Sequence, residues 1–121
     1  MVYLQAGFNN PAPFMKDLFL NLKPSVVFKR ITKQQLKMLQ TALDVWTFFG
    51  FTPTVTSAND SKHRTNSLHY TDLALDFRTK DLPPGVAGGI ASQLQTSLGL
   101  GYDVVMEKDH IHTEYDNKRG R

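Results

Sequence analysis

The sequence of 121 residues contains no cysteine. This absence excludes disulfide bonds, thiolate metal sites and thiol nucleophiles. The chain also lacks any apolar run approaching the ~20 residues of a membrane-spanning helix. Its first twenty residues contain neither the apolar stretch nor the cleavage site of a signal peptide. We therefore expect a chain that is made in the cytoplasm and does not insert into a membrane.

A large excess of charge of one sign is absent too. The 14 Lys and Arg residues against 11 Asp and Glu residues give a formal net charge of +3. This value is too small to indicate an anionic polymer as partner. No motif of interleaved basic and aromatic residues indicates nucleic-acid binding. Repeats and linkers are not evident, so we expect a single domain spanning residues 1–121.

The apolar periodicity predicts an α+β fold with two main helices and a small antiparallel sheet. Thr32 and Gln35 form a capping-box pattern at the start of the first helix, which should end near Phe49. Its expected core residues are Leu36, Leu39, Leu43, Trp46 and Phe49. A second helix is expected from Pro83 to Leu98. The expected strands are residues 25–30, 51–58, 73–78, 102–106 and 111–115, and the segment up to Pro24 reads as extended or irregular.

The chemically suggestive residues lie in the second half of the chain, which contains all four histidines. In the strand 73–78, Asp76 should point away from the face of Leu75 and Phe77, because successive side chains alternate. By the same rule His110, His112 and Glu114 share one face of the last strand. If the two strands are neighbours, Asp76 and His112 face a common point. The loop that precedes the earlier strand could bring His69 to the same place.

Two imidazoles and one carboxylate leave a fourth coordination position open, which is typical of catalytic zinc. The candidate ligands are His69, Asp76 and His112. Zinc would activate a water molecule, and a nearby carboxylate would move its proton.

Asp109 and Glu107 are the candidate acid/base residues. His110 is either a partner of the site or a further ligand. The competing interpretation is a solvated His-x-His face, with Asp76 paired to Arg64, Arg78 or Lys80.

Two segments resemble motifs of a known enzyme family. Residues 67–78, SLHYTDLALDFR, resemble the Ser-x-His-x-x-Gly-x-Ala-x-Asp signature of zinc peptidoglycan peptidases. Residues 107–116, EKDHIHTEYD, resemble the second motif, in which an acidic residue precedes the last zinc histidine by three positions. The family comprises D-Ala-D-Ala carboxypeptidases and L-alanyl-D-glutamate endopeptidases, including small phage endolysins. It is related in fold to hedgehog signalling domains.

The resemblance implies that His69, Asp76 and His112 bind Zn²⁺ and that Asp109 is the main acid/base residue. Asp72 stands where the family usually has glycine. The arginine that often follows the preceding strand is absent from its usual place, which leaves Arg64 or His63 as the candidate clamp for a substrate carboxylate.

The function implied is that of a zinc-dependent peptidoglycan peptidase, similar to L-alanyl-D-glutamate endopeptidases of phage endolysins. It would cut stem-peptide amide bonds with metal-activated water. The alternatives are a D-Ala-D-Ala carboxypeptidase and a non-catalytic zinc-bearing phage module that serves in structure or binding. We expect a monomer that acts on the cell wall, either released by a partner or carried by the virion.

Overall fold

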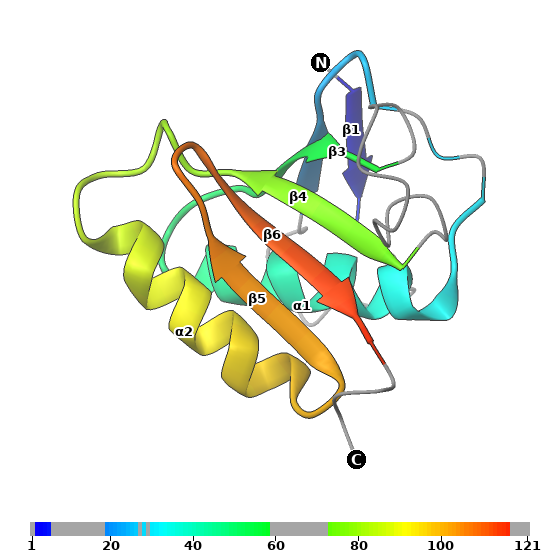
Figure 1. The fold of residues 1–121 in the computed structure, drawn as a ribbon. Coiled ribbons are helices and arrows are strands. Elements are labelled where there is room, and N and C mark those ends of the chain that lie inside the picture. The colour runs from blue at the N-terminus through cyan, green and yellow to red at the C-terminus, as the bar shows by residue number, and fades with distance from the viewer. Residues whose placement is uncertain (1, 6–18, 27, 29, 59–72, 117–121) are drawn as a thin grey trace, which may run out of the picture.

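The computed structural model describes residues 2–5, 19–26, 28, 30–58 and 73–116, and shows an α+β fold (Figure 1). Two helices and one six-stranded sheet make up this part of the chain, and the strand order is β1-β2-β3-β4-β6-β5. In chain order the elements are β1 (Val2–Gln5), β2 (Phe19–Leu22), α1 (Lys33–Phe48), β3 (Thr54–Ser57), β4 (Ala74–Arg78), α2 (Val86–Leu98), β5 (Tyr102–Met106) and β6 (His110–Tyr115). Neither helix in these ranges is long and apolar enough to cross a membrane.

The sheet is mixed, so the prediction of an antiparallel sheet is wrong for one pair of strands. β2 and β3 run parallel, with Asn21 opposite Thr54 and Leu22 opposite Val55. The reason is the connection between them, which passes through α1, because a crossover containing a helix returns the chain in the same direction. The other four pairs are antiparallel, as expected.

Helix α1 follows the sequence prediction closely. The Thr32 hydroxyl accepts a hydrogen bond from the Gln35 backbone N–H, and the Gln35 side chain accepts one from the Thr32 backbone N–H. This reciprocal pair is the capping box. The predicted core face is wrong at Leu36, which is 47% exposed, whereas Met38 is fully buried.

Two segment boundaries differ from the prediction. The described residues of 25–30 form no strand, because the strand that pairs with β3 lies earlier, at Phe19–Leu22. Helix α2 begins at Val86 rather than at the two prolines. Gly85 before it adopts a left-handed conformation with φ +85°, which ends the preceding turn and excludes an earlier helical start.

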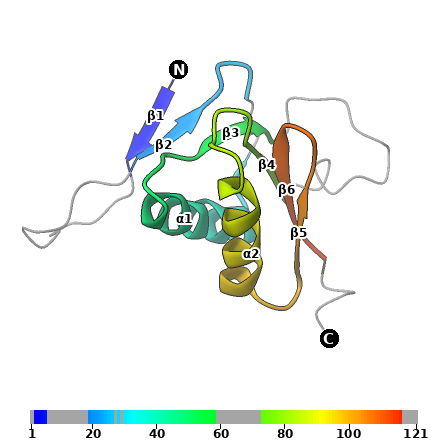
Figure 2. The same cartoon turned by 90° about the vertical axis from the view of Figure 1, so that its left-hand side faces the viewer.

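Both helices cover the same face of the sheet (Figure 2). Trp46 of α1 packs on Phe77 of β4 with ring centroids 5.3 Å apart, and Ile90 and Leu94 of α2 are fully buried in the same core. On β4 and β6, Leu75, Phe77 and Ile111 point into this core. Because strand side chains alternate, the residues between them lie on the opposite face. That opposite face carries the candidate site.

Candidate active site

The pairing of β4 with β6 brings the sequence-predicted residues together. In the antiparallel register, Asp76 lies opposite His112, Arg78 opposite His110 and Ala74 opposite Glu114. The spacing of two residues on each strand places these side chains on the face away from the helices. The expectation that Asp76 and His112 face a common point is confirmed.

His112 lies between two carboxylates. Its Nδ1 is 2.8 Å from Oδ1 of Asp76, and its Nε2 is 2.7 Å from Oε1 of Glu114. Because ionised carboxylates only accept hydrogen bonds, the imidazole satisfies both contacts when both of its nitrogens carry protons. Burial disfavours that charged form, but the hydrogen bonds to Asp76 and Glu114 outweigh it and raise the pKa of His112 from 6.5 to about 9.

His110 lies next to this group of side chains, on its solvent-facing side. Its Nδ1 is 2.7 Å from Oδ1 of Asp109, and its Nε2 is 3.3 Å from Oε1 of Glu107 and 3.8 Å from Oδ2 of Asp76. Burial lowers the pKa of His110, but the hydrogen bond to Asp109 and the neighbouring carboxylates reverse this effect and raise it overall. The same hydrogen bond lowers the pKa of Asp109 and holds that carboxylate ionised.

The cluster runs from a buried end to an open end. The side chain of Asp76 is 10% exposed and that of His112 is 17% exposed, whereas Asp109 is 67% exposed. Its acidic members are Asp76, Glu107, Asp109 and Glu114. Four carboxylates around two imidazoles leave a net negative charge even when both imidazoles are protonated. A divalent cation bound beside Asp76 would offset that excess.

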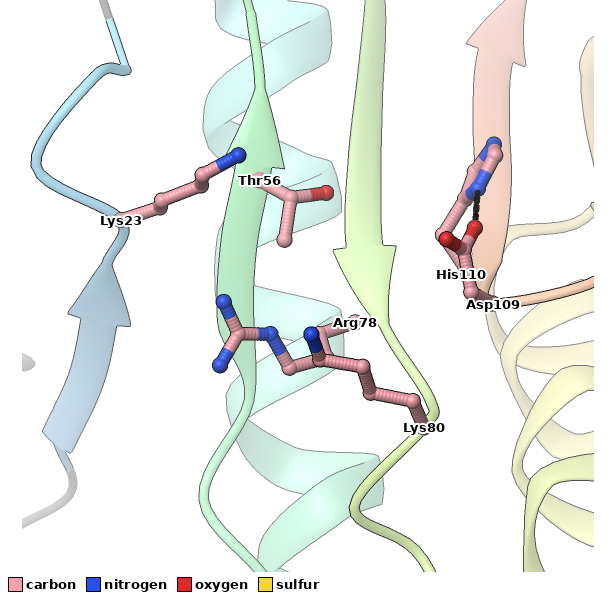
Figure 3. A pocket seen from close by; sticks show the side chains of 6 residues that line it. All are labelled: Lys23, Thr56, Arg78, Lys80, Asp109 and His110. Atoms are coloured by element: carbon pink, nitrogen blue, oxygen red, sulfur yellow. Dashed lines mark hydrogen bonds and ion pairs between the residues drawn. The ribbon is translucent and has the colours of Figure 1, made fainter.

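A pocket of about 230 Å³ opens beside His110 (Figure 3). Asp109 and His110 line one side, at the start of β6, and Thr56 of β3 lines its floor. Basic side chains line the rest of the pocket: Lys23 just after β2, Arg78 at the end of β4, and Lys80 beyond it. The pocket therefore joins the acidic cluster to a group of cations on the same sheet face.

The structure brings together part of the predicted set. Asp76 and His112 are in direct contact, and Glu107 and Asp109 both contact His110. His69 and Arg64 lie outside the described residues, so neither the third candidate ligand nor the candidate clamp is placed. Within the described part of the chain, no group of three His, Asp or Glu side chains is arranged to hold a metal ion. Asp76 and His112 lie within that part of the chain, whereas His69 does not.

Of the basic residues considered as alternative partners of Asp76, Arg64 lies outside the described residues, and no ion pair joins Asp76 to Arg78 or Lys80 in the described part of the chain. The carboxylate of Asp76 contacts His112 and His110, which are basic side chains of the neighbouring strand. Arg78 lies two residues after Asp76 on β4 and therefore shares its face, and its side chain lines the pocket. The His-x-His pair is not a fully solvated face, because the His112 side chain is mostly covered.

Several residues of this face were missed as site residues. Glu114 and Arg78 could have been found, since each lies two residues along a strand from His112 or Asp76 and must share its face. Lys23 carried no such signal. It reaches the pocket through the parallel pairing of β2 with β3, where its backbone N–H donates to the Val55 carbonyl at 2.9 Å.

Comparisons with known proteins add no relative. No protein-family model matches the chain, and a search of curated proteins gives no match.

Proposed function

We propose that the protein is a zinc-dependent peptidoglycan peptidase of the hedgehog/D,D-peptidase fold, acting as an L-alanyl-D-glutamate-type endopeptidase. The observation that carries this proposal is the contact between Asp76 and His112. These are the carboxylate and the last histidine of two separate sequence motifs, and they lie opposite one another on adjacent strands. Residues 36 apart in sequence thus lie side by side on one sheet face, as a shared zinc site requires.

The donor chemistry fits zinc. Asp76 and His112 would supply one oxygen and one nitrogen donor, and His69 is the third residue that would hold the ion. The ion would take the place of the proton that Nδ1 of His112 donates in its hydrogen bond to Oδ1 of Asp76 in the metal-free protein. Zinc bound there would polarise the carbonyl of the scissile amide and lower the pKa of a bound water molecule. The Asp76 carboxylate is mostly covered and lies among oxygen and nitrogen donors, an environment that suits a divalent cation.

The surrounding residues have separate roles in this proposal. Asp109 is ionised and open to solvent, so it can accept a proton from water and return it to the leaving amine. His110 holds the Asp109 carboxylate by its Nδ1–H and stands between that carboxylate and Asp76. Glu114 binds Nε2 of His112 and fixes the orientation of its ring.

The direct experiment is digestion of purified peptidoglycan, with the products identified by mass spectrometry. The proposal expects stem peptides that begin with an unblocked D-glutamate, formed with zinc and lost after chelation. Asp109→Asn should form these products about 10²–10⁴-fold more slowly. Absence of new amino groups with the zinc-loaded wild-type protein would overturn the proposal.

A D-Ala-D-Ala carboxypeptidase is the second candidate, favoured by one observation. Such an enzyme must hold a terminal carboxylate, and Arg78 lines the pocket next to His110. The same digestion separates the two activities, because a carboxypeptidase releases free D-alanine and creates no new amino terminus on D-glutamate.

A further inference from the structure

The pocket beside the acidic cluster is lined mainly by basic side chains. Lys23, Arg78 and Lys80 line it from three separate segments, and Asp109 is the one carboxylate among the six described residues that line it. That carboxylate is engaged by His110 at 2.7 Å. In the described part of the chain, no carboxylate forms an ion pair with any of the three cations. Asp109 also interacts electrostatically with Lys80, so three cations face one carboxylate in this cavity. The excess of positive charge favours an anion as the ligand.

The geometry limits what the anion can be. Arg78 lies opposite His110 in the β4–β6 register, and its guanidinium extends over β3 toward the space near Thr56 and Lys23 (Figure 3). A planar guanidinium with parallel N–H groups matches a carboxylate by two hydrogen bonds. The pocket volume of about 230 Å³ is below the roughly 300–1,000 Å³ of sites that enclose a whole small ligand. It suits one charged group whose parent chain continues outside.

We infer that this pocket binds a carboxylate of the stem peptide and so positions the scissile amide over the neighbouring Asp76–His112 pair. The inference rests on the proposed function for the identity of the peptide. It assigns to Lys23, Arg78 and Lys80 the role of binding the substrate carboxylate, for which the sequence resemblance implies Arg64 or His63. The carboxylate is either the α-carboxylate of D-glutamate or the carboxyl terminus of the peptide.

Binding of three synthetic peptides tests the inference. The parent is the fluorescently labelled pentapeptide L-Ala-γ-D-Glu-L-Lys-D-Ala-D-Ala, and the other two have either the D-glutamate carboxylate or the carboxyl terminus amidated. Kd is measured by anisotropy with the full-length protein as purified, under conditions in which mass spectrometry shows the peptide intact. One amidated peptide should bind about tenfold more weakly than the parent, which corresponds to one charge-assisted contact. The identity of that peptide tells which carboxylate enters the pocket.

Substitutions of the basic pocket residues test whether they cause the preference for the free carboxylate. Arg78→Gln should remove most of the difference between the parent and the sensitive amidated peptide. Lys80→Gln should reduce it and serves as a second variant if Arg78→Gln folds poorly. Lys33→Gln makes the same charge change at the exposed start of α1 and should leave the preference intact. Equal binding of all three peptides by the wild-type protein would overturn the inference.

Three further outcomes separate this inference from the proposed function and from another ligand. Hydrolysis with equal binding of all peptides would keep the peptidase and remove the pocket's role. A carboxylate preference that depends on Arg78, without hydrolysis, would keep the pocket and remove the peptidase. Displacement of the parent peptide by poly(glycerol phosphate), together with indifference to amidation, would overturn the inference in favour of a wall polymer.

Discussion

Oδ1 of Asp76 lies 2.8 Å from Nδ1 of His112, across the antiparallel pairing of β4 with β6. Glu114 holds the other nitrogen of the same ring. The imidazole is thus clamped from both sides by carboxylates on two strands. This arrangement makes the protonation of His112 part of the stability of the sheet.

The metal-free protein should lose stability as the pH rises through about 9. The folded-state pKa of His112, about 9, lies above its ordinary value of 6.5. The contribution of the protonated ring is therefore complete below about pH 6.5 and is lost above about pH 9. Its size is on the order of 3 kcal/mol. Urea unfolding of chelator-treated wild type and His112→Gln should show a wide gap in unfolding free energy at pH 6 and a narrow one at pH 10. A gap of equal size at both pH values would contradict this assignment.

Asp109→Asn should reduce peptide hydrolysis by about 10²–10⁴-fold, the usual loss when a positioned acid/base group is removed. Zinc content should not change, because Asp109 is not among the expected ligands. Glu107→Gln is the matched control, since both carboxylates contact His110. A larger loss in Glu107→Gln than in Asp109→Asn would transfer the acid/base role to Glu107.

Gln35→Leu should destabilise the protein by about 2 kcal/mol or more. The fully buried Gln35 side chain donates to the Ala74 carbonyl at 3.2 Å and accepts from the Thr32 backbone N–H at 3.2 Å. Leucine would remove both hydrogen bonds, and loss of the side-chain partner of the buried Ala74 carbonyl alone costs about 1–3 kcal/mol. Gln40→Leu, on the exposed side of the same helix, should stay within about 0.5 kcal/mol. Equal urea midpoints for the two variants would show that Gln35 does not anchor β4.

Two glycine substitutions should change stability in opposite directions. Gly101 has φ +90°, and a Cβ there would lie 2.9 Å from Cε1 of Tyr115. Gly101→Ala should therefore cost about 1–2 kcal/mol from its backbone alone, with a further cost from displacing the ring. Gly88 lies inside α2 with nothing within 4 Å of an added Cβ. Gly88→Ala should stabilise the protein by about 1 kcal/mol. Thermal denaturation of both variants checks the signs.

The central part of the candidate site follows from local rules. Side-chain alternation placed His112 and Glu114 on one face of β6 and Asp76 on the face of β4 opposite Leu75 and Phe77, and the capping box of Thr32 and Gln35 located the start of α1. These features depend on residues that are close in sequence. Their physical causes act within one strand or one helical turn.

The cationic side of the pocket could not be read in the same way. Lys23 reaches it because β2 pairs in parallel with β3 after a helical crossover, and no local pattern specifies that pairing. The same long-range pairing explains why the first strand of this region lies at Phe19–Leu22 rather than at residues 25–30. Charges that converge from separate segments are a property of the tertiary fold.

The central claim is that Asp76 and His112 belong to a zinc site. The most direct measurement is the metal content of the purified protein by mass spectrometry, for wild type, His112→Gln and the control His63→Gln, after zinc loading and removal of free metal. The account predicts about one zinc per chain in the wild type and in His63→Gln, as expected for one site, and its loss in His112→Gln. A zinc-free wild type, or zinc retained in full by His112→Gln, would contradict it.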